Sequence, residues 1–164
     1  MVKKCILILG MHRSGTSALA GVLHQLGISM GKNLIAPASD NPKGFYENEN
    51  ITLFNENELL PALNTSYDDT KIIRIKDILG FSSKSYLIQK ATDILTHDYQ
   101  DKEIFGIKDP RLCIVFPFWE EVLLKFETEI KIVIPFRNPL EVAYSLYLRN
   151  NLPVGQGLFL WAKT

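Results

Sequence analysis

The fold of this chain is decided by the stretch CILILGMHRSGTS, residues 5–17. It opens with a short, uncharged, β-rich run, which predicts a parallel strand that is covered on both faces and lies at the centre of a sheet. Apolar residues then recur on one side of a predicted helix from Ala18 to Leu26, and Gly27 offers a left-handed stop. This order predicts an α/β protein with a three-layer, P-loop-like fold, in which helices flank a central parallel sheet. The length suits one domain, residues 1–164.

The loop that follows this strand, residues 10–17, predicts an anion-binding site. The first backbone N–H groups of a helix have no carbonyl partners, and together with the helix dipole they attract an anion. A nucleotide triphosphatase would carry a lysine where this loop has Thr16, so the pattern points away from ATP hydrolysis. The only cation in the loop is Arg13, whose planar guanidinium suits a bidentate grip on phosphate or sulfate oxygens. The alternative is a glycine-rich turn without a ligand.

A second segment, IVIPFRNP at residues 132–139, follows the same plan. Its first three residues predict another buried strand. Asn138 is a favoured N-cap, and Pro139 fits the first helical position, where its missing N–H costs nothing. Ser145 lies two helical turns beyond the cap on the same helix face, and Arg137 lies just before the helix, so both can reach one ligand. A capping arginine and an exposed serine are the alternative interpretation.

Together these segments resemble the cofactor signatures of the sulfotransferase family, whose members transfer a sulfuryl group from 3′-phosphoadenosine 5′-phosphosulfate (PAPS). Arg137 and Ser145 match, at the family's spacing of eight, the pair that holds the 3′-phosphate. GIKDPRL at 106–112 resembles a strand-end motif of many bacterial sulfotransferases, and its Lys-Asp-Pro core also appears in the tyrosylprotein branch. NPKGFYEN at 41–48 resembles the bacterial acceptor-side loop. The family's loop around the 5′-phosphosulfate is matched by Arg13, Ser14, Gly15, Thr16 and Ser17.

The resemblance implies roles that agree with the chemistry of sulfuryl transfer. Breaking the phosphosulfate bond leaves negative charge on the departing phosphate, so positioned cations and N–H groups stabilise the transition state. Arg13, the loop amides and Lys108 suit that role. Thr16 and Ser17 can donate hydroxyl hydrogen bonds to the 5′-phosphate, with no metal between. The implied donor is PAPS, and the acceptor is a hydroxyl or amine of a small molecule, glycan or peptide.

A base must take the proton of the acceptor, and Glu47 is the predicted one. It lies in a loop after the first helix and resembles the position from which tyrosylprotein sulfotransferases supply a glutamate. The alternative is that Glu47 begins the next helix, where the dipole favours it, and the nearby Glu49 could be mistaken for it. Cytosolic sulfotransferases use a histidine base, although a structural or solvated role is expected for each histidine here, His12, His24 and His97.

Lys108 follows a predicted strand over residues 104–107, and ligands of open parallel sheets bind beyond the carboxyl ends of strands. Lys108 is therefore predicted to be functional. The alternative is an ion pair with Asp109 or Glu47 that only orders the loop. Arg111 either binds the acceptor or braces Glu47, and the sequence does not choose between them.

Composition supports this class of protein without adding chemistry. Eighteen basic and eighteen acidic residues cancel, which gives no support for a nucleic-acid or membrane surface. Cys5 and Cys113 are too few for a disulfide framework or a metal site, so no metal is predicted and a cytoplasmic setting is expected. The apolar run near the N-terminus is too short for a signal peptide or a membrane span.

Further helices are predicted over residues 49–60, ended by Pro61, over residues 83–95, and from Pro117 onward. The chain ends inside a predicted helix at residues 158–164, so the family's C-terminal segment is expected to be lacking. Two other functions stay open. One is a P-loop kinase or NTPase with an altered loop, for which Asp109 is the candidate magnesium ligand. The other is a truncated, non-catalytic nucleotide-binding domain.

Overall fold

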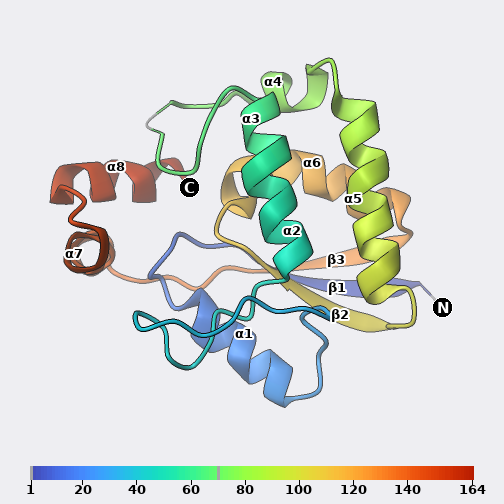
Figure 1. Ribbon diagram of the computed structural model, residues 1–164, viewed down its shortest axis with the longest axis horizontal. Helices are drawn as coiled ribbons and strands as arrows, with labels where there is room; N and C mark the ends of the chain where they lie inside the picture. Colours follow the sequence, from blue (N-terminus) through green and yellow to red (C-terminus); the bar gives the residue numbers. More distant parts are fainter. Residues whose placement is uncertain (1, 70) are drawn as a thin grey trace.

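A computed structural model describes residues 2–69 and 71–164 and shows an α/β protein built on a three-stranded parallel sheet (Figure 1). The strands are β1 (Lys3–Ile8), β2 (Ile104–Lys108) and β3 (Thr128–Val133), in the order β2-β1-β3. The register places Cys5 opposite Phe105 on one side and Ile130 on the other. The prediction that the first strand lies at the centre of a parallel sheet is confirmed.

Helices and one π-helical segment connect and cover the strands. They are α1 (Thr16–Gln25), α2 (Glu49–Phe54), η1 (Asn55–Leu59), α3 (Leu60–Ala62), α4 (Ile75–Gly80), α5 (Lys84–Tyr99), α6 (Leu112–Lys125), α7 (Pro139–Asn150) and α8 (Val154–Lys163). The helix predicted after the loop is confirmed as α1, followed by Gly27 with φ +87°. The helix predicted from Ser83 is α5, which begins at Lys84 and continues to Tyr99.

Two apolar layers cover the sheet, as expected for strands whose side chains alternate between faces. Figure 1 shows α1 on one face and α2, α5 and α6 on the other. Ile8 packs toward α1 with Ala20 and Met30. Cys5 and Leu7 belong to the larger core on the opposite face. The predicted three-layer arrangement is therefore present.

The helix that begins at Glu49 does not end before Pro61, so that prediction is wrong. It continues through η1, where the N–H of Leu60 donates to the carbonyl of Asn55, and ends at Ala62. A proline inside an α-helix clashes with the carbonyl four residues earlier. The wider π turn just before Pro61 changes that geometry, which explains why the helix passes through it.

Pro117 lies inside α6, so the prediction that it begins a helix is also wrong. The helix begins at Leu112 and bends at Val115, whose φ is −109° and ψ 19°. The bend places Pro117 in the first turn of the second half, where a backbone N–H is not needed. Trp119, Val122 and Leu123 lie on one side of this second half and are fully buried.

The strand predicted from Ile132 is found, but its expected burial is wrong. Ile132, Val133 and Ile134 are 45, 38 and 67% exposed, and Ile134 lies beyond the end of β3. In the described part of the chain β3 pairs only with β1, so it is an edge strand with one side open. Its apolar sequence resembles that of a central strand, which is why the sequence overstates its burial.

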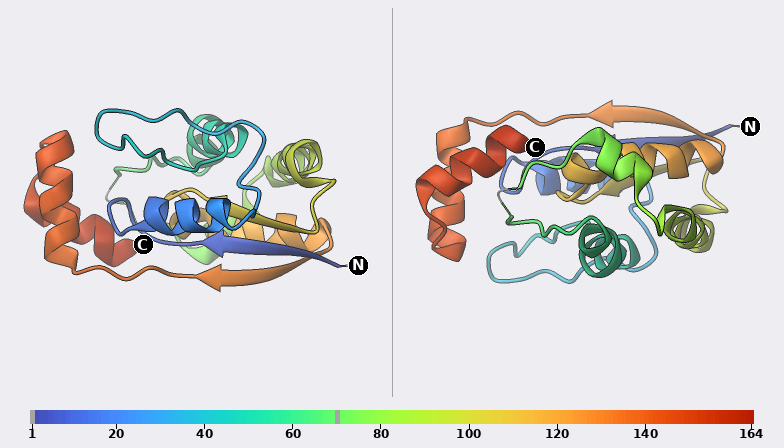
Figure 2. Two further views of the ribbon diagram at one scale, coloured as in Figure 1. Left: turned by 90° about the horizontal axis from the view of Figure 1, so that it is seen from below. Right: turned by 90° about the horizontal axis from the view of Figure 1, so that it is seen from above.

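Helices α7 and α8 pack against each other beyond the carboxyl ends of the strands (Figure 2). Asn138 caps α7 as predicted, because its side chain accepts a hydrogen bond from the N–H of Leu140. At Gly157 an added Cβ would lie 3.0 Å from the backbone of Ala143, so glycine permits the close approach of the two helices. Over the described residues, none of the helices has the length and apolar character needed to cross a bilayer.

Candidate active site

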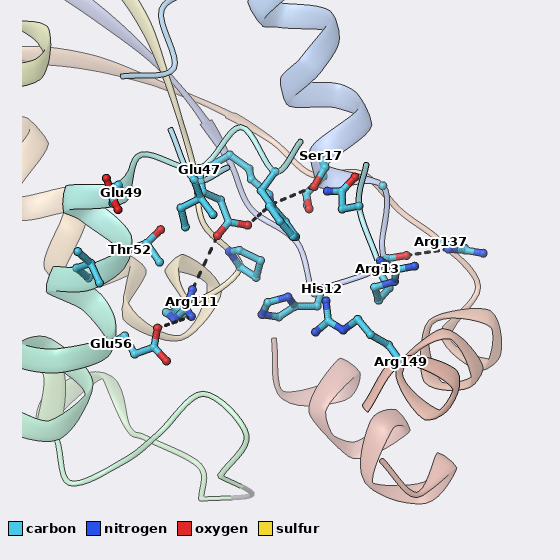
Figure 3. Close-up of a pocket in the computed structure, with 18 residues that line it drawn as sticks. His12, Arg13, Ser17, Glu47, Glu49, Thr52, Glu56, Arg111, Arg137 and Arg149 are labelled. Atoms are coloured by element: carbon cyan, nitrogen blue, oxygen red, sulfur yellow. Dashed lines mark hydrogen bonds and ion pairs between the residues drawn. The ribbon is translucent and has the colours of Figure 1, made fainter. Parts of the chain in front are cut away.

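A cavity of about 530 Å³ opens at the carboxyl ends of the strands, between α1, α2 and α7 (Figure 3). Seven of the nine predicted site residues line it. They are Arg13, Gly15, Thr16, Ser17, Glu47, Lys108 and Arg137. Ser14 and Ser145 do not line it. Such a cavity has the size of a small-molecule site and lies where ligands of open α/β sheets bind.

The loop before α1 is shaped for an anion. Gly15, with φ +92°, is the N-cap of α1. Because glycine has no side chain that could cap the helix, the first N–H groups of α1 stay available to a ligand. A Cβ at Gly10 would lie 2.8 Å from Cγ2 of Thr16, so the turn requires glycine there. Arg13 has φ +68°, a left-handed conformation that non-glycine residues adopt at a cost and that is common at ligand sites.

Arg13, Arg137 and Ser145 meet in space although they are far apart in sequence. Nε of Arg13 donates to Oγ of Ser145 at 2.8 Å, and Nη1 of Arg137 donates to the carbonyl of Arg13 at 2.9 Å. Nε of Arg137 pairs with Glu141 at 3.0 Å. The predicted Arg/Ser pair therefore lies beside the loop. Ser145 lies behind Arg13, and Arg137 lies on the cavity wall.

Lys108 and Glu47 form a buried ion pair at the centre of the site. They are 3 and 5% exposed, and Nζ of Lys108 donates to Oε1 of Glu47 and, at 3.2 Å, to Oγ of Ser17. Burial raises the pKa of Glu47, and the ammonium of Lys108 opposes that rise. Glu47 does not begin α2, because Asn48 is the N-cap and Glu49 the first helical residue. The pair anticipated as the alternative for Lys108 is formed, and it lies inside the cavity.

Arg111 braces the site from the β2 side. Nη1 lies 3.0 Å from Oδ1 of Asp109 and 4.0 Å from Oε2 of Glu47, while Nη2 lies 2.9 Å from Oε2 of Glu56. These carboxylates, with Asp109 first, keep the pKa of Arg111 above its usual value against the effect of burial. The bracing role left open by the sequence is thus seen, and Arg111 also lines the cavity.

Asp109 is fully buried and occupied by protein groups. Its carboxylate accepts from the backbone N–H and Nη1 of Arg111 and, at 2.8 Å, from Nδ2 of Asn55, whose own oxygen accepts from Nε1 of Trp119. It does not line the cavity. This engagement leaves Asp109 poorly suited to hold a magnesium ion.

Among the histidines, His12 alone lines the cavity. Burial, and then the positive charges of Lys108, Arg149, Arg111 and Arg13, lower its pKa well below the usual value, so the ring is neutral. It packs edge-on against Tyr67 with ring centroids 4.1 Å apart. His24 and His97 lie elsewhere: His24 is an exposed residue of α1, and His97 contacts Asp98 on α5.

Sequence reasoning missed several wall residues. Arg149 lines the cavity and pairs with Asp40 at 3.2 Å. Its signal was its spacing, because it lies one helical turn after Ser145 on the same face of α7. The opposite helical segment, α2 continued by η1, presents a stripe that we call the α2 face; it is formed by Glu49, Thr52 and Leu53 of α2 and Glu56 of η1. These positions have the three- and four-residue spacing of one helix side.

Charge is divided across the cavity. Figure 3 shows Arg13, Arg137 and Arg149 near α1 and α7, opposite Glu49 on α2 and Glu56 on η1. One half of the cavity is thus basic. The other holds the carboxylates of Glu49 and Glu56, and of these Glu56 is paired with Arg111. The Lys108–Glu47 ion pair lies between the halves. Such a division suits two ligands of different charge.

Comparison with known proteins identifies no relative: no protein-family model, no curated protein and no solved structure matches this chain. Within residues 2–69 and 71–164, no three His, Cys, Asp or Glu side chains gather as a metal site requires. Because an α/β fold alone does not define an activity, function must be argued from the cavity.

Proposed function

We propose that this chain is a sulfotransferase that moves a sulfuryl group from PAPS to a hydroxyl or amine of a small-molecule, glycan or peptide acceptor. The observation that carries the proposal is the meeting of Arg13, Arg137, Lys108 and Glu47 in one cavity at the N-terminus of α1. These residues come from four separate motifs that resemble the same family. Each motif alone is weak evidence, and it is their convergence in one cavity that supports the family interpretation.

The cavity residues fit the donor. The free N–H groups of α1 and the hydroxyls of Thr16 and Ser17 suit a 5′-phosphosulfate. The space next to the α-carbon of Gly15 is open, because a Cβ added there would meet no atom within 4 Å. Arg137 suits the 3′-phosphate, with a guanidinium free to offer its remaining N–H groups beyond the bonds to Glu141 and the Arg13 carbonyl. Ser145 acts through Arg13, which it holds in place.

PAPS supplies the transferred group: a bond forms between the acceptor oxygen or nitrogen and sulfur, while the bond from sulfur to the 5′-phosphate oxygen breaks and releases 3′-phosphoadenosine 5′-phosphate (PAP). Lys108 and Arg13 stabilise charge on the departing phosphate. Glu47 takes the acceptor proton. Its burial favours this role, because a raised pKa makes a carboxylate a stronger base near neutral pH.

The kinase alternative receives no comparable support. It needs a lysine in the loop, where Thr16 stands, and a free acidic residue for magnesium. Asp109, the candidate, already accepts hydrogen bonds from Arg111 and Asn55.

Calorimetric titration tests the donor site. PAP is expected to bind without metal and more tightly than AMP, which lacks the 3′-phosphate, or ATP with magnesium. Arg137→Ala should weaken PAP binding by about tenfold or more and leave AMP binding nearly unchanged, because charged hydrogen bonds contribute about 1.5–3 kcal/mol. Arg74→Ala, which removes an exposed arginine of an ion pair outside the cavity, is the matched control. Tighter binding of magnesium ATP than of PAP would contradict the proposal.

Turnover tests the role of Glu47. Glu47→Gln should keep PAP affinity within about twofold and lower PAP release from PAPS, in the presence of an acceptor, by about 100-fold or more, as expected when a general base is lost. A variant with normal turnover and weakened PAP binding would reverse the assignment. It would make Glu47 a residue of the donor site.

A further inference from the structure

Unmet hydrogen-bonding capacity is concentrated in this one cavity. Throughout the described residues, three buried side-chain polar atoms have no hydrogen-bond partner: Nε2 of His12, Oγ1 of Thr52 and Nε of Arg111. All three residues line the cavity. Since folded proteins pair nearly all buried polar groups with protein, water or ligand, this clustering points to a bound molecule that completes the site.

Thr52 is the member of this group that lies on the acidic half. It is 4% exposed and projects from α2 between Glu49 and Glu56 (Figure 3). Glu49 is exposed, and across residues 2–69 and 71–164 no cation lies within ion-pairing distance of it. In the described part of the chain, the single ion pair of Glu56 is with Arg111, which also pairs with Asp109. The α2 face therefore combines surplus negative charge with a buried hydroxyl that lacks a partner.

The basic half of the cavity allows the charge of the acceptor, the second ligand, to be predicted. Arg13, Arg137 and Arg149 suit an anionic donor, which adds its own negative charge to the cavity. An anionic acceptor would then be repelled by the donor and by Glu49 together. A cationic acceptor would be attracted by both, and Thr52 Oγ1 can accept a hydrogen bond from its ammonium group.

We infer that the α2 face recognises an acceptor that carries an ammonium group near the hydroxyl or amine that receives the sulfuryl group. The inference rests on the proposed function, because it assigns the other half of the cavity to the donor. Glu49 supplies the opposite charge, and Thr52 supplies the buried acceptor oxygen. Glu47 lies just before this helix, beside the place where the acceptor would lose its proton.

Two matched series of compounds test the inference. Tyramine, 4-ethylphenol and 4-hydroxyphenylacetate share a phenolic hydroxyl and differ in the charge of the side chain. Glucosamine, glucose and glucuronate make the same comparison for sugar hydroxyls. Binding of each to the PAP-loaded protein is measured by calorimetry, so the result does not depend on transfer; transfer from PAPS is then measured with the same compounds.

The ammonium compound of at least one series should bind about fivefold more tightly than its neutral partner, a modest factor because Glu49 is exposed to solvent screening. Glu49→Gln should remove most of that preference. Glu120→Gln, which changes another exposed glutamate on α6 outside the cavity, is the control and should leave it intact. PAP affinity should be the same in all three proteins.

Thr52→Val separates recognition from structure. Because the buried hydroxyl has no partner in the protein, its removal should keep or raise the melting temperature while weakening binding of the ammonium compound. A lower melting temperature with unchanged binding would show that Thr52 is only structural.

The outcomes distinguish the two proposals. If PAP binds but neither ammonium compound is preferred over its neutral partner, or Glu49→Gln leaves the preference unchanged, the inference is overturned and the donor site stands. If the wild-type protein does not bind PAP, the proposed function fails, and the acceptor assignment fails with it. An ammonium preference that depends on Glu49 in a protein that binds PAP supports both.

Discussion

Replacing Lys108 by methionine removes the cation from the most deeply buried ion pair of the site. The side chains of Lys108 and Glu47 are 2 and 7% exposed, so the carboxylate left behind is almost fully desolvated. Removing one partner of a buried pair costs about 3–5 kcal/mol. The guanidinium of Arg111, 4.0 Å from Glu47, compensates part of that loss, so we expect about 3 kcal/mol at pH 7.5. For a chain of this size that corresponds to a melting temperature lower by about 9 °C.

The penalty should depend on pH in a defined direction. Burial raises the pKa of Glu47 in the folded protein, and Lys108 opposes that rise. Loss of the Lys108 ammonium therefore raises the folded-state pKa further, whereas the pKa in the unfolded chain keeps its ordinary value. The penalty is therefore complete above that raised pKa. It disappears as the pH falls toward the ordinary value of a glutamate, because the folded variant then takes up a proton at Glu47.

Urea denaturation followed by circular dichroism at pH 7.5 and pH 5 measures both effects. The matched control is Lys131→Met, which removes the cation of an exposed pair with Glu129, 62 and 44% exposed. Solvent screens that exposed pair, so its loss should change the stability only slightly. Equal losses in the two variants, or a loss for Lys108→Met that does not shrink at pH 5, would refute the reasoning.

Two further substitutions test the frame around the site. Asn55→Ala removes the amide that joins the carboxylate of Asp109 to the indole of Trp119, and leaving these buried groups unpaired should cost about 2–4 kcal/mol in urea denaturation. A loss below about 1 kcal/mol would mean that water replaces the amide. Gly31→Ala places a Cβ directly against the side chain of Asn48 at a φ of +125°, and it should lower the melting temperature by about 4 °C or more. An unchanged melting temperature would contradict the packing seen there.

The sequence predicts the central parts of the fold because their signals are local. An uncharged β-rich run followed by glycine and a one-sided apolar stripe specifies β1, the loop and α1 without reference to the rest of the chain. The burial of β3 is different. Its apolar residues suit either a central or an edge strand, and only the tertiary arrangement decides that Ile132 and Val133 are exposed.

Site residues could be predicted from the sequence where their side-chain chemistry is specific. They could not be predicted where burial and packing decide their role. Arg13 and Arg137 were identified from motifs, and they do lie together. The contact of Arg13 with Ser145 depends on how α7 packs, which no local pattern gives. Thr52 was missed for a similar reason: an unpartnered hydroxyl is a property of the packed structure, and threonine on a polar helix is unremarkable in sequence.

The position of Lys108 would supply the proposed anion site with the lysine that the loop itself lacks. A P-loop lysine leaves the first turn of its helix to reach the phosphates. Here the ammonium comes from the end of β2, and its hydrogen bond to Ser17 places it at that same first turn of α1. A cation supplied by a neighbouring strand can also contact a second group, and Lys108 contacts Glu47. Negative charge drawn to Lys108 from the donor side would weaken its hold on Glu47, so the carboxylate would become a stronger base when the donor is in place.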